Sequence, residues 1–133
     1  MNELVIDATL ENLDAVQEFV SSTLEDRPLK VQNQIGIVMD EIFSNIARYA
    51  YSPEVGGVTV RIAVDDDITI EFEDSGIAYN PLSSETPDTT LSADEREVGG
   101  LGIFMVKKLM DSVEYKRDGN KNLLTVKKRL PQA

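Results

Sequence analysis

A carboxylate and an amide that lie four residues apart are the first candidates for chemistry in this chain. Glu41 and Asn45 fall in a segment whose apolar residues recur at helical spacing. An α-helix turns about 100° per residue, so residues four apart stack on one edge of the helix, here beside its apolar stripe. A half-sheltered Glu and Asn can hold a metal ion, a nucleotide or a reacting water, although ordinary boundary polar residues show the same pattern.

Two further polar stations follow this segment. Asp74 and Gly76 stand where a β-branched stretch ends, and Gly99, Gly100 and Gly102 precede an apolar helical pattern. Glycines ahead of a helix let an anion approach its free N–H groups and partial positive charge, which suits a phosphate. An Asp at a strand end is often only a turn former, and glycine clusters often mark tight turns. Beside an aromatic base, however, an Asp can accept a hydrogen bond from an exocyclic amine.

The composition excludes several kinds of chemistry. The 133 residues include no histidine and no cysteine, which rules out His-based triads, His or Cys zinc sites, thiol nucleophiles and disulfides. A general base must then be a carboxylate, a lysine or a tyrosine. No apolar run approaches the roughly 20 residues of a membrane helix, and the N-terminus shows no signal peptide pattern. These features suit a cytoplasmic protein without membrane contact.

The charge balance indicates a class of partner. The chain has 24 acidic and 13 basic residues, a net charge of −11. Such a chain is a poor candidate for binding nucleic acid through phosphate neutralisation. A protein partner with a basic surface fits better, although solubility alone would account for the charge.

The hydrophobic pattern predicts the elements that position these residues. The predicted strands cover 2–10, 58–64, 68–73, 113–116 and 123–126. The predicted helices cover 12–24, about 29–51 and the segment that follows the glycines. Antiparallel hairpins with helices gathered on one face predict an α+β two-layer sandwich with a mixed, mostly antiparallel sheet. At 133 residues without internal repeats, residues 1–133 are expected to form a single domain.

Residues 82–98 form a long segment with little periodicity, rich in Ser, Thr, Asp, Glu and Pro. Loops longer than about 12–15 residues are uncommon in compact domains and are often functional. We interpret this segment as a lid between the Asp74 station and the glycines, the alternative being a tolerated insertion.

The three polar stations, in this order and with a lid between the last two, resemble the Bergerat ATP-binding fold of the GHKL superfamily. Within it, the chain is most similar to the bacterial anti-sigma-factor serine/threonine kinases, over roughly residues 4–130. The resemblance implies a regulatory kinase that binds ATP and Mg²⁺ and phosphorylates a small antagonist protein. A sigma factor as a second partner and a homodimer are consistent with the family.

The resemblance implies a role for each station. Glu41 matches the acid proposed as general base, and Asn45 matches the Mg²⁺ ligand. Asp74 matches the residue that reads adenine, with Gly76 as its glycine partner. The remaining nucleotide-binding matches, to lid glycines that cradle phosphates and to a strand hydroxyl that supports adenine, are Gly99, Gly100, Gly102 and Thr125. Thr125 could equally be an ordinary β-branched strand residue.

Two departures from the family's pattern bear on activity. Such kinases commonly carry one Arg in the first helix and another just before the lid glycines, whereas 12–24 has no Arg or Lys and Arg96 is displaced. Phosphoryl transfer needs cations to balance transition-state charge. Arg48, on the same helix edge as Glu41 and Asn45, could substitute or could instead form a salt bridge. A catalytically silent, nucleotide-gated protein-binding module and a slow ATPase are therefore the alternative functions.

Overall fold

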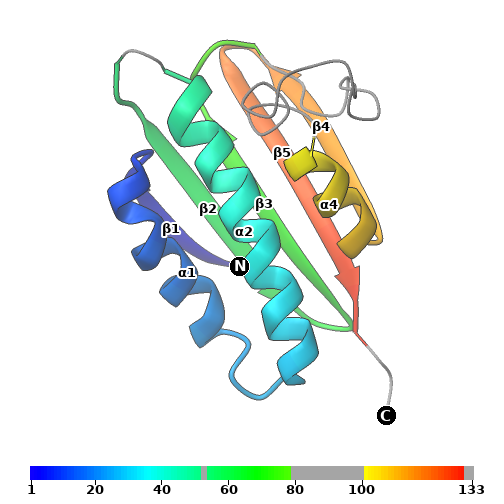
Figure 1. The fold of residues 1–133 in the computed structure, drawn as a ribbon. Coiled ribbons are helices and arrows are strands. Elements are labelled where there is room, and N and C mark those ends of the chain that lie inside the picture. The colour runs from blue at the N-terminus through cyan, green and yellow to red at the C-terminus, as the bar shows by residue number, and fades with distance from the viewer. Residues whose placement is uncertain (52–53, 79–100, 131–133) are drawn as a thin grey trace.

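A five-stranded sheet covered on one face by helices makes up the part of the chain that the computed structural model describes, residues 1–51, 54–78 and 101–130 (Figure 1). The strands are β1 (Asn2–Asp7), β2 (Gly57–Val64), β3 (Asp67–Asp74), β4 (Ser112–Asp118) and β5 (Lys121–Arg129). The helices are α1 (Leu13–Ser22), α2 (Leu29–Tyr49) and α4 (Leu101–Leu109), with a short 3-10 helix at Leu10–Asn12.

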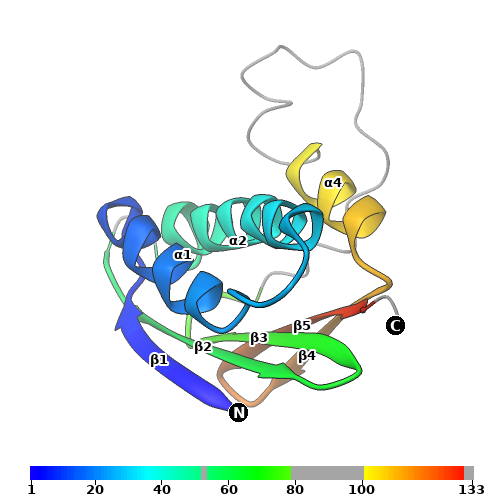
Figure 2. The same cartoon turned by 90° about the horizontal axis from the view of Figure 1, so that it is seen from below.

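The sheet places the end of β3 beside the start of β5. Its strand order is β1-β2-β3-β5-β4, and each neighbouring pair of described strands is antiparallel. In this register Phe72 lies opposite Leu124, and Asp74 lies opposite Asn122. Figure 2 shows the helices as one layer and the sheet as the other. The predicted α+β two-layer sandwich is confirmed.

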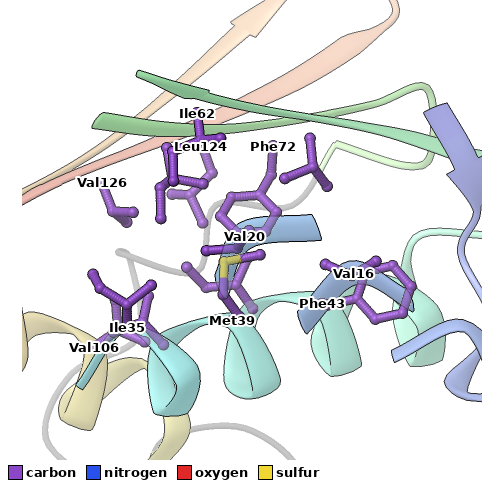
Figure 3. Close-up of a cluster of buried hydrophobic side chains, with 14 of the residues drawn as sticks. Val16, Val20, Ile35, Met39, Phe43, Ile62, Phe72, Val106, Leu124 and Val126 are labelled. Carbon is purple, nitrogen blue, oxygen red and sulfur yellow. The ribbon is translucent and has the colours of Figure 1, made fainter. Parts of the chain in front are cut away.

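The core lies between these two layers. Alternation along β3 buries Ile68, Ile70 and Phe72 on the helix-facing side, as expected for a strand with one covered face. From the other layer, Met39 and Phe43 of α2 are fully buried. Figure 3 shows Met39, Phe43 and Phe72 packed between helix and sheet. Burial of this apolar surface is the main force that holds α2 against β3.

The apolar stripe of α2 changes role along its length. Its first two thirds are buried, with Ile35, Val38 and Ile42 at 2% exposure or less. Ile46 and Tyr49 continue the same stripe but are only half-buried, and both line a pocket. The periodicity therefore predicted a core face correctly, and its last turn faces a cavity.

The predicted boundaries differ from the observed ones near the N-terminus. The strand predicted over 2–10 ends at Asp7, because the Thr9 N–H donates to the Asp7 carbonyl (2.9 Å) and a 3-10 helix follows. The predicted lid, 82–98, lies outside the described residues. No helix in the described part of the chain is long and apolar enough to cross a membrane.

Candidate functional site

A pocket opens between the second half of α2, the end of β3, the start of β5 and the first turn of α4. Its empty volume is about 520 Å³, including space open to solvent. Its walls are mostly aliphatic and aromatic, with three polar side chains besides two tyrosines. The lining residues are Ile42, Asn45, Ile46, Tyr49, Ala50, Phe72, Asp74, Ile77, Ile103, Tyr115, Asn122 and Leu124. An apolar slot with a few convergent polar groups is the usual form of a small-molecule site.

Asp74 is a buried carboxylate at the inner end of this slot. It follows Ile68, Ile70 and Phe72 on the covered face of β3, where another apolar residue would be the rule, and it is 7% exposed. Its Oδ1 accepts hydrogen bonds from the Gly76 N–H (2.9 Å) and from Asn122 Nδ2 (2.9 Å). A buried carboxylate needs such donors to offset its desolvation. Among the described residues, no donor contacts Oδ2.

Gly76 stands where the turn after β3 touches the C-terminal end of α2. A Cβ at this position would lie 2.2 Å from the Ala50 carbonyl oxygen and 2.6 Å from its carbon. The adjacent Ile77 N–H donates to that same oxygen (2.9 Å). Only glycine allows the two backbones to approach this closely. The structure thus brings Asp74 and Gly76 together in one turn.

Tyr51 holds the turn from the α2 side. Its hydroxyl donates to the Gly57 carbonyl (2.6 Å) and accepts from the Ser75 N–H (2.7 Å). The residues just after α2, the start of β2 and the turn after β3 are thus joined at one hydroxyl. The turn that carries Asp74 is consequently fixed relative to the helix that carries Asn45.

Asn122 is the site residue that the sequence reasoning missed. It lies on β5 opposite Asp74, is 6% exposed, and donates to both Asp74 Oδ1 (2.9 Å) and the Ile77 carbonyl (2.7 Å). A signal was present, because Asn122, Leu124 and Val126 share one face of a strand, and an Asn in line with two core residues invites a search for its partner.

Thr125, by contrast, does not reach the pocket, and its predicted adenine contact is corrected by the structure. Leu124 and Val126 on either side of it are buried in the core. Successive side chains of a strand point to opposite faces, so Thr125 lies on the uncovered face of the sheet, between Glu71 and Glu114. Asn122 occupies the position on β5 that the prediction gave to Thr125.

The edge of α2 carries the predicted pair Glu41 and Asn45. Asn45 lines the pocket together with Asp74, and Glu41 lies one turn earlier on the same edge, half-buried. Burial raises the pKa of the Glu41 carboxyl, the neighbouring Asp40 charge raises it further, and Arg48 lowers it. Within the described part of the chain, Arg48 forms no ion pair with an acid. Arg48 therefore acts on Glu41 through its field and not through a salt bridge there.

The glycine station is described only in part. Gly102 lies in the first turn of α4, and Ile103, next to it, lines the pocket. The start of α4 therefore lies at the pocket. Gly99 and Gly100 lie outside the described residues.

The polar side chains of the pocket suit a cation that would also bind the phosphates of a nucleotide better than a cation held by protein groups alone. No group of three or more acidic side chains that could hold a metal ion occurs among the described residues. Mg²⁺ usually binds one or two protein oxygens together with substrate phosphates and waters. The side-chain oxygen of Asn45, at the pocket, suits that mode of binding.

Comparison with known proteins identifies the family. The histidine kinase-like ATPase domain matches residues 6–128. The chain is 27% identical over 128 residues to the serine/threonine-protein kinase BtrW of Bordetella bronchiseptica, which covers 93% of this chain and 89% of that protein. It is also 27% identical over 96 residues to the serine-protein kinase RsbW of Bacillus mycoides, covering 68% of this chain and 60% of the relative.

A solved structure supports the fold independently. The RsbU and RsbW domains of a Mycobacterium tuberculosis protein superpose with a TM-score of 0.64 at 17% identity, covering 100% of this chain and 34% of that one. The chain thus spans less than two thirds of the length of the RsbW kinase and of this structural neighbour. The family match includes α1, α2, α4, β2, β3 and β4, most of β5 and the end of β1, together with the residues that line the pocket. The chain belongs to the histidine kinase-like ATPase domain family.

Proposed function

We propose that this chain binds ATP with Mg²⁺ and is a regulatory protein serine/threonine kinase, an anti-sigma-factor-like switch that phosphorylates a small antagonist protein. The observation that carries the proposal is Asp74, a buried carboxylate at the end of an apolar slot with one oxygen free of described donors. Two relatives given above, the kinases BtrW and RsbW, support the assignment of a phosphotransferase.

The slot suits an adenine ring. Aliphatic walls such as Ile42, Ile77 and Ile103 match the two flat faces of a purine. The free Asp74 oxygen accepts a hydrogen bond from the exocyclic amine, which guanine lacks at the equivalent position. Hydrogen bonds to a charged group contribute about 1.5–3 kcal/mol, enough to decide between bases.

The phosphates would extend from the slot toward α2 and the start of α4. In this arrangement the free N–H groups of the first turn of α4, near Gly102, face anionic oxygens. Asn45 supplies a ligand oxygen for Mg²⁺. When bound, the ion neutralises charge on the phosphates during transfer.

Glu41 is the candidate general base. Its carboxylate would take the proton of a substrate Ser or Thr hydroxyl as that oxygen bonds to the γ-phosphorus and the bond to the β–γ bridging oxygen breaks, releasing ADP. A raised pKa strengthens a carboxylate as a base, because it holds the proton more firmly. Arg48 is the nearby cation that could balance transition-state charge.

One observation favours the alternative, a nucleotide-gated binding module without transfer. The α1 segment, Leu13–Ser22, contains no Arg or Lys, so it brings no cation to the phosphates. ATP occupancy would then control which protein is held, without loss of phosphate. Slow ATP hydrolysis is the third function that the same site could perform.

Phosphate transfer from γ-labelled ATP to the cognate antagonist protein distinguishes these functions. The kinase predicts a labelled antagonist, and Glu41→Gln should reduce the rate by roughly a hundredfold or more, since a general base contributes about 10²–10⁴-fold. Glu18→Gln, the same change on an exposed part of α1, is the matched control. Stoichiometric ATP binding without labelled product would favour the module, and an unchanged rate in Glu41→Gln would rule out its role.

The family resemblance extends the proposal to the protein's setting. From this resemblance we also propose a single ATP-binding domain over 1–133 and a cytoplasmic location. Its further partners would be a sigma factor or a second copy of the chain. The net charge of −11 supports protein partners over nucleic acid.

A further inference from the structure

Arg117 contacts the nucleotide pocket from outside. It lies on β4, is exposed, and is not among the residues that line the pocket. Its Nη1 donates to the Gly76 carbonyl (2.9 Å) and to Asn122 Oδ1 (3.1 Å), and its Nε donates to the Gly119 carbonyl (3.1 Å). A side chain that would ordinarily be a solvated surface charge is thus tied to the two partners of Asp74.

The Asn122 amide is fully occupied by this network. Its Nδ2 donates to Asp74 Oδ1 and to the Ile77 carbonyl, while its Oδ1 accepts from the Tyr115 hydroxyl and from Arg117. An amide has two donor hydrogens and an oxygen that accepts two hydrogen bonds, so no capacity is left for a ligand. Asn122 therefore acts on a nucleotide only through Asp74.

Arg117 helps to fix the orientation of this amide, together with the Asp74 carboxylate and the Ile77 carbonyl, which accept from its NH₂ group. A tyrosine hydroxyl both donates and accepts, so Tyr115 would tolerate either orientation, whereas a guanidinium can only donate. With Arg117 in place, a flipped amide would set its NH₂ against the guanidinium and its oxygen against the Asp74 carboxylate. Without Arg117, one of the restraints against this flip disappears, and the Gly76 carbonyl loses a donor as well.

We propose that Arg117 is a positioning residue for base selectivity: through the Asn122 amide and the Gly76 carbonyl, it orients the Asp74 carboxylate toward the exocyclic amine of adenine. The inference rests on the proposed function, because it requires adenine in the pocket. The competing explanation is that Arg117 merely closes the β4–β5 turn through its bond to Gly119. Only the first explanation predicts an effect that depends on the amine of the base.

The test compares two nucleotides that differ only at that amine. Binding of ATP and of purine riboside triphosphate, which lacks the 6-amino group, is measured by isothermal titration with Mg²⁺. The wild-type chain should prefer ATP by about ten- to a hundredfold, the range expected for one hydrogen bond to a charged acceptor. Arg117→Met should reduce this preference at least about fivefold, by weakening ATP alone.

Lys116→Met is the matched control, since it removes the same charge from the next residue of β4, which points to the opposite face of the sheet. It should leave the affinities of both nucleotides unchanged. A second readout needs no nucleotide: hydrogen exchange of the Asn122 side-chain amide, followed by NMR, should quicken in Arg117→Met while the melting temperature stays near that of Lys116→Met.

The possible results distinguish a failure of this inference from a failure of the proposed function. Equal weakening of both nucleotides by Arg117→Met, or no weakening with unchanged Asn122 exchange, would overturn the inference and leave the proposed function standing. A wild-type chain that binds neither nucleotide would instead overturn the proposed function, and the inference with it.

Discussion

Replacement of Gly76 by alanine tests the geometry on which the site depends. The new Cβ would lie 2.2 Å from the Ala50 oxygen and 2.6 Å from its carbon, both backbone atoms at the end of α2. That end is itself anchored, because the Ala50 N–H donates to the Ile46 carbonyl (3.0 Å). The turn after β3 must therefore move away, since rotation of a side chain cannot relieve the contact.

The expected magnitude follows from what this movement breaks. Loss of the hydrogen bond from the Ile77 N–H to Ala50 costs about 1 kcal/mol, and overpacking typically costs about 1–3 kcal/mol. A total of about 2–4 kcal/mol corresponds to a fall in melting temperature of roughly 8–16 °C for a chain of this size. The Gly76 N–H also withdraws from Asp74, so ATP affinity should fall at least about tenfold.

Thermal unfolding followed by circular dichroism, together with ATP titration, measures both effects. Gly57→Ala is the matched control, because a Cβ there meets nothing closer than 3.9 Å. It should change stability by less than about 0.5 kcal/mol. Our reasoning about the close approach would be refuted if Gly76→Ala melted and bound ATP like Gly57→Ala.

Three further predictions concern α2. Gly36→Ala should stabilise the chain by about 0.5–1 kcal/mol, because glycine is costly inside a helix and a Cβ there would meet only Gln17 Oε1, at 3.8 Å; an unchanged or lower melting temperature would contradict this. Asp40→Asn should lower the pKa of Glu41 and Arg48→Met should raise it, as measured by carboxyl NMR, and opposite shifts would contradict the assigned causes. Burial raises the pKa of Glu41, so the folded chain holds the Glu41 proton more firmly than the unfolded chain does. The stability gained from this proton is present at acidic pH and is lost as the pH rises through the raised pKa. Glu41→Gln should therefore raise the melting temperature at neutral pH, with no gain below the ordinary range of a Glu carboxyl.

The sequence was informative wherever a local pattern decides the structure. The i,i+4 spacing of Glu41 and Asn45 put both on one edge of α2, and the change from apolar residues to Asp74 marked the end of a covered strand. These inferences need only the geometry of one helix or one strand, which the periodicity of the sequence contains. The partnership of Gly76 with Asp74, by contrast, came from the family resemblance.

Pairing between strands was beyond this reasoning. Thr125 is a different case: it was matched through the family resemblance, whereas alternation along β5 with Leu124 and Val126 already places it on the uncovered face. Asn122 and Arg117 act through a register that joins β3, β5 and β4, and their sequence positions, 48 and 43 residues after Asp74, do not reveal it. The two hydrogen bonds of the Tyr51 hydroxyl likewise depend on three segments that meet only in the folded chain.

The central claim is that Asp74 reads adenine in an ATP site. The most direct test is isothermal titration of ATP, with and without Mg²⁺, into the wild-type chain and into Asp74→Asn. The variant keeps an oxygen for Gly76 and Asn122 but turns an amide donor toward the base, so it should fold normally and repel the exocyclic amine. We predict Mg²⁺-dependent binding that weakens by about ten- to a hundredfold or more in the variant. Equal ATP affinity in both proteins, or no binding by the wild-type chain, would contradict the account.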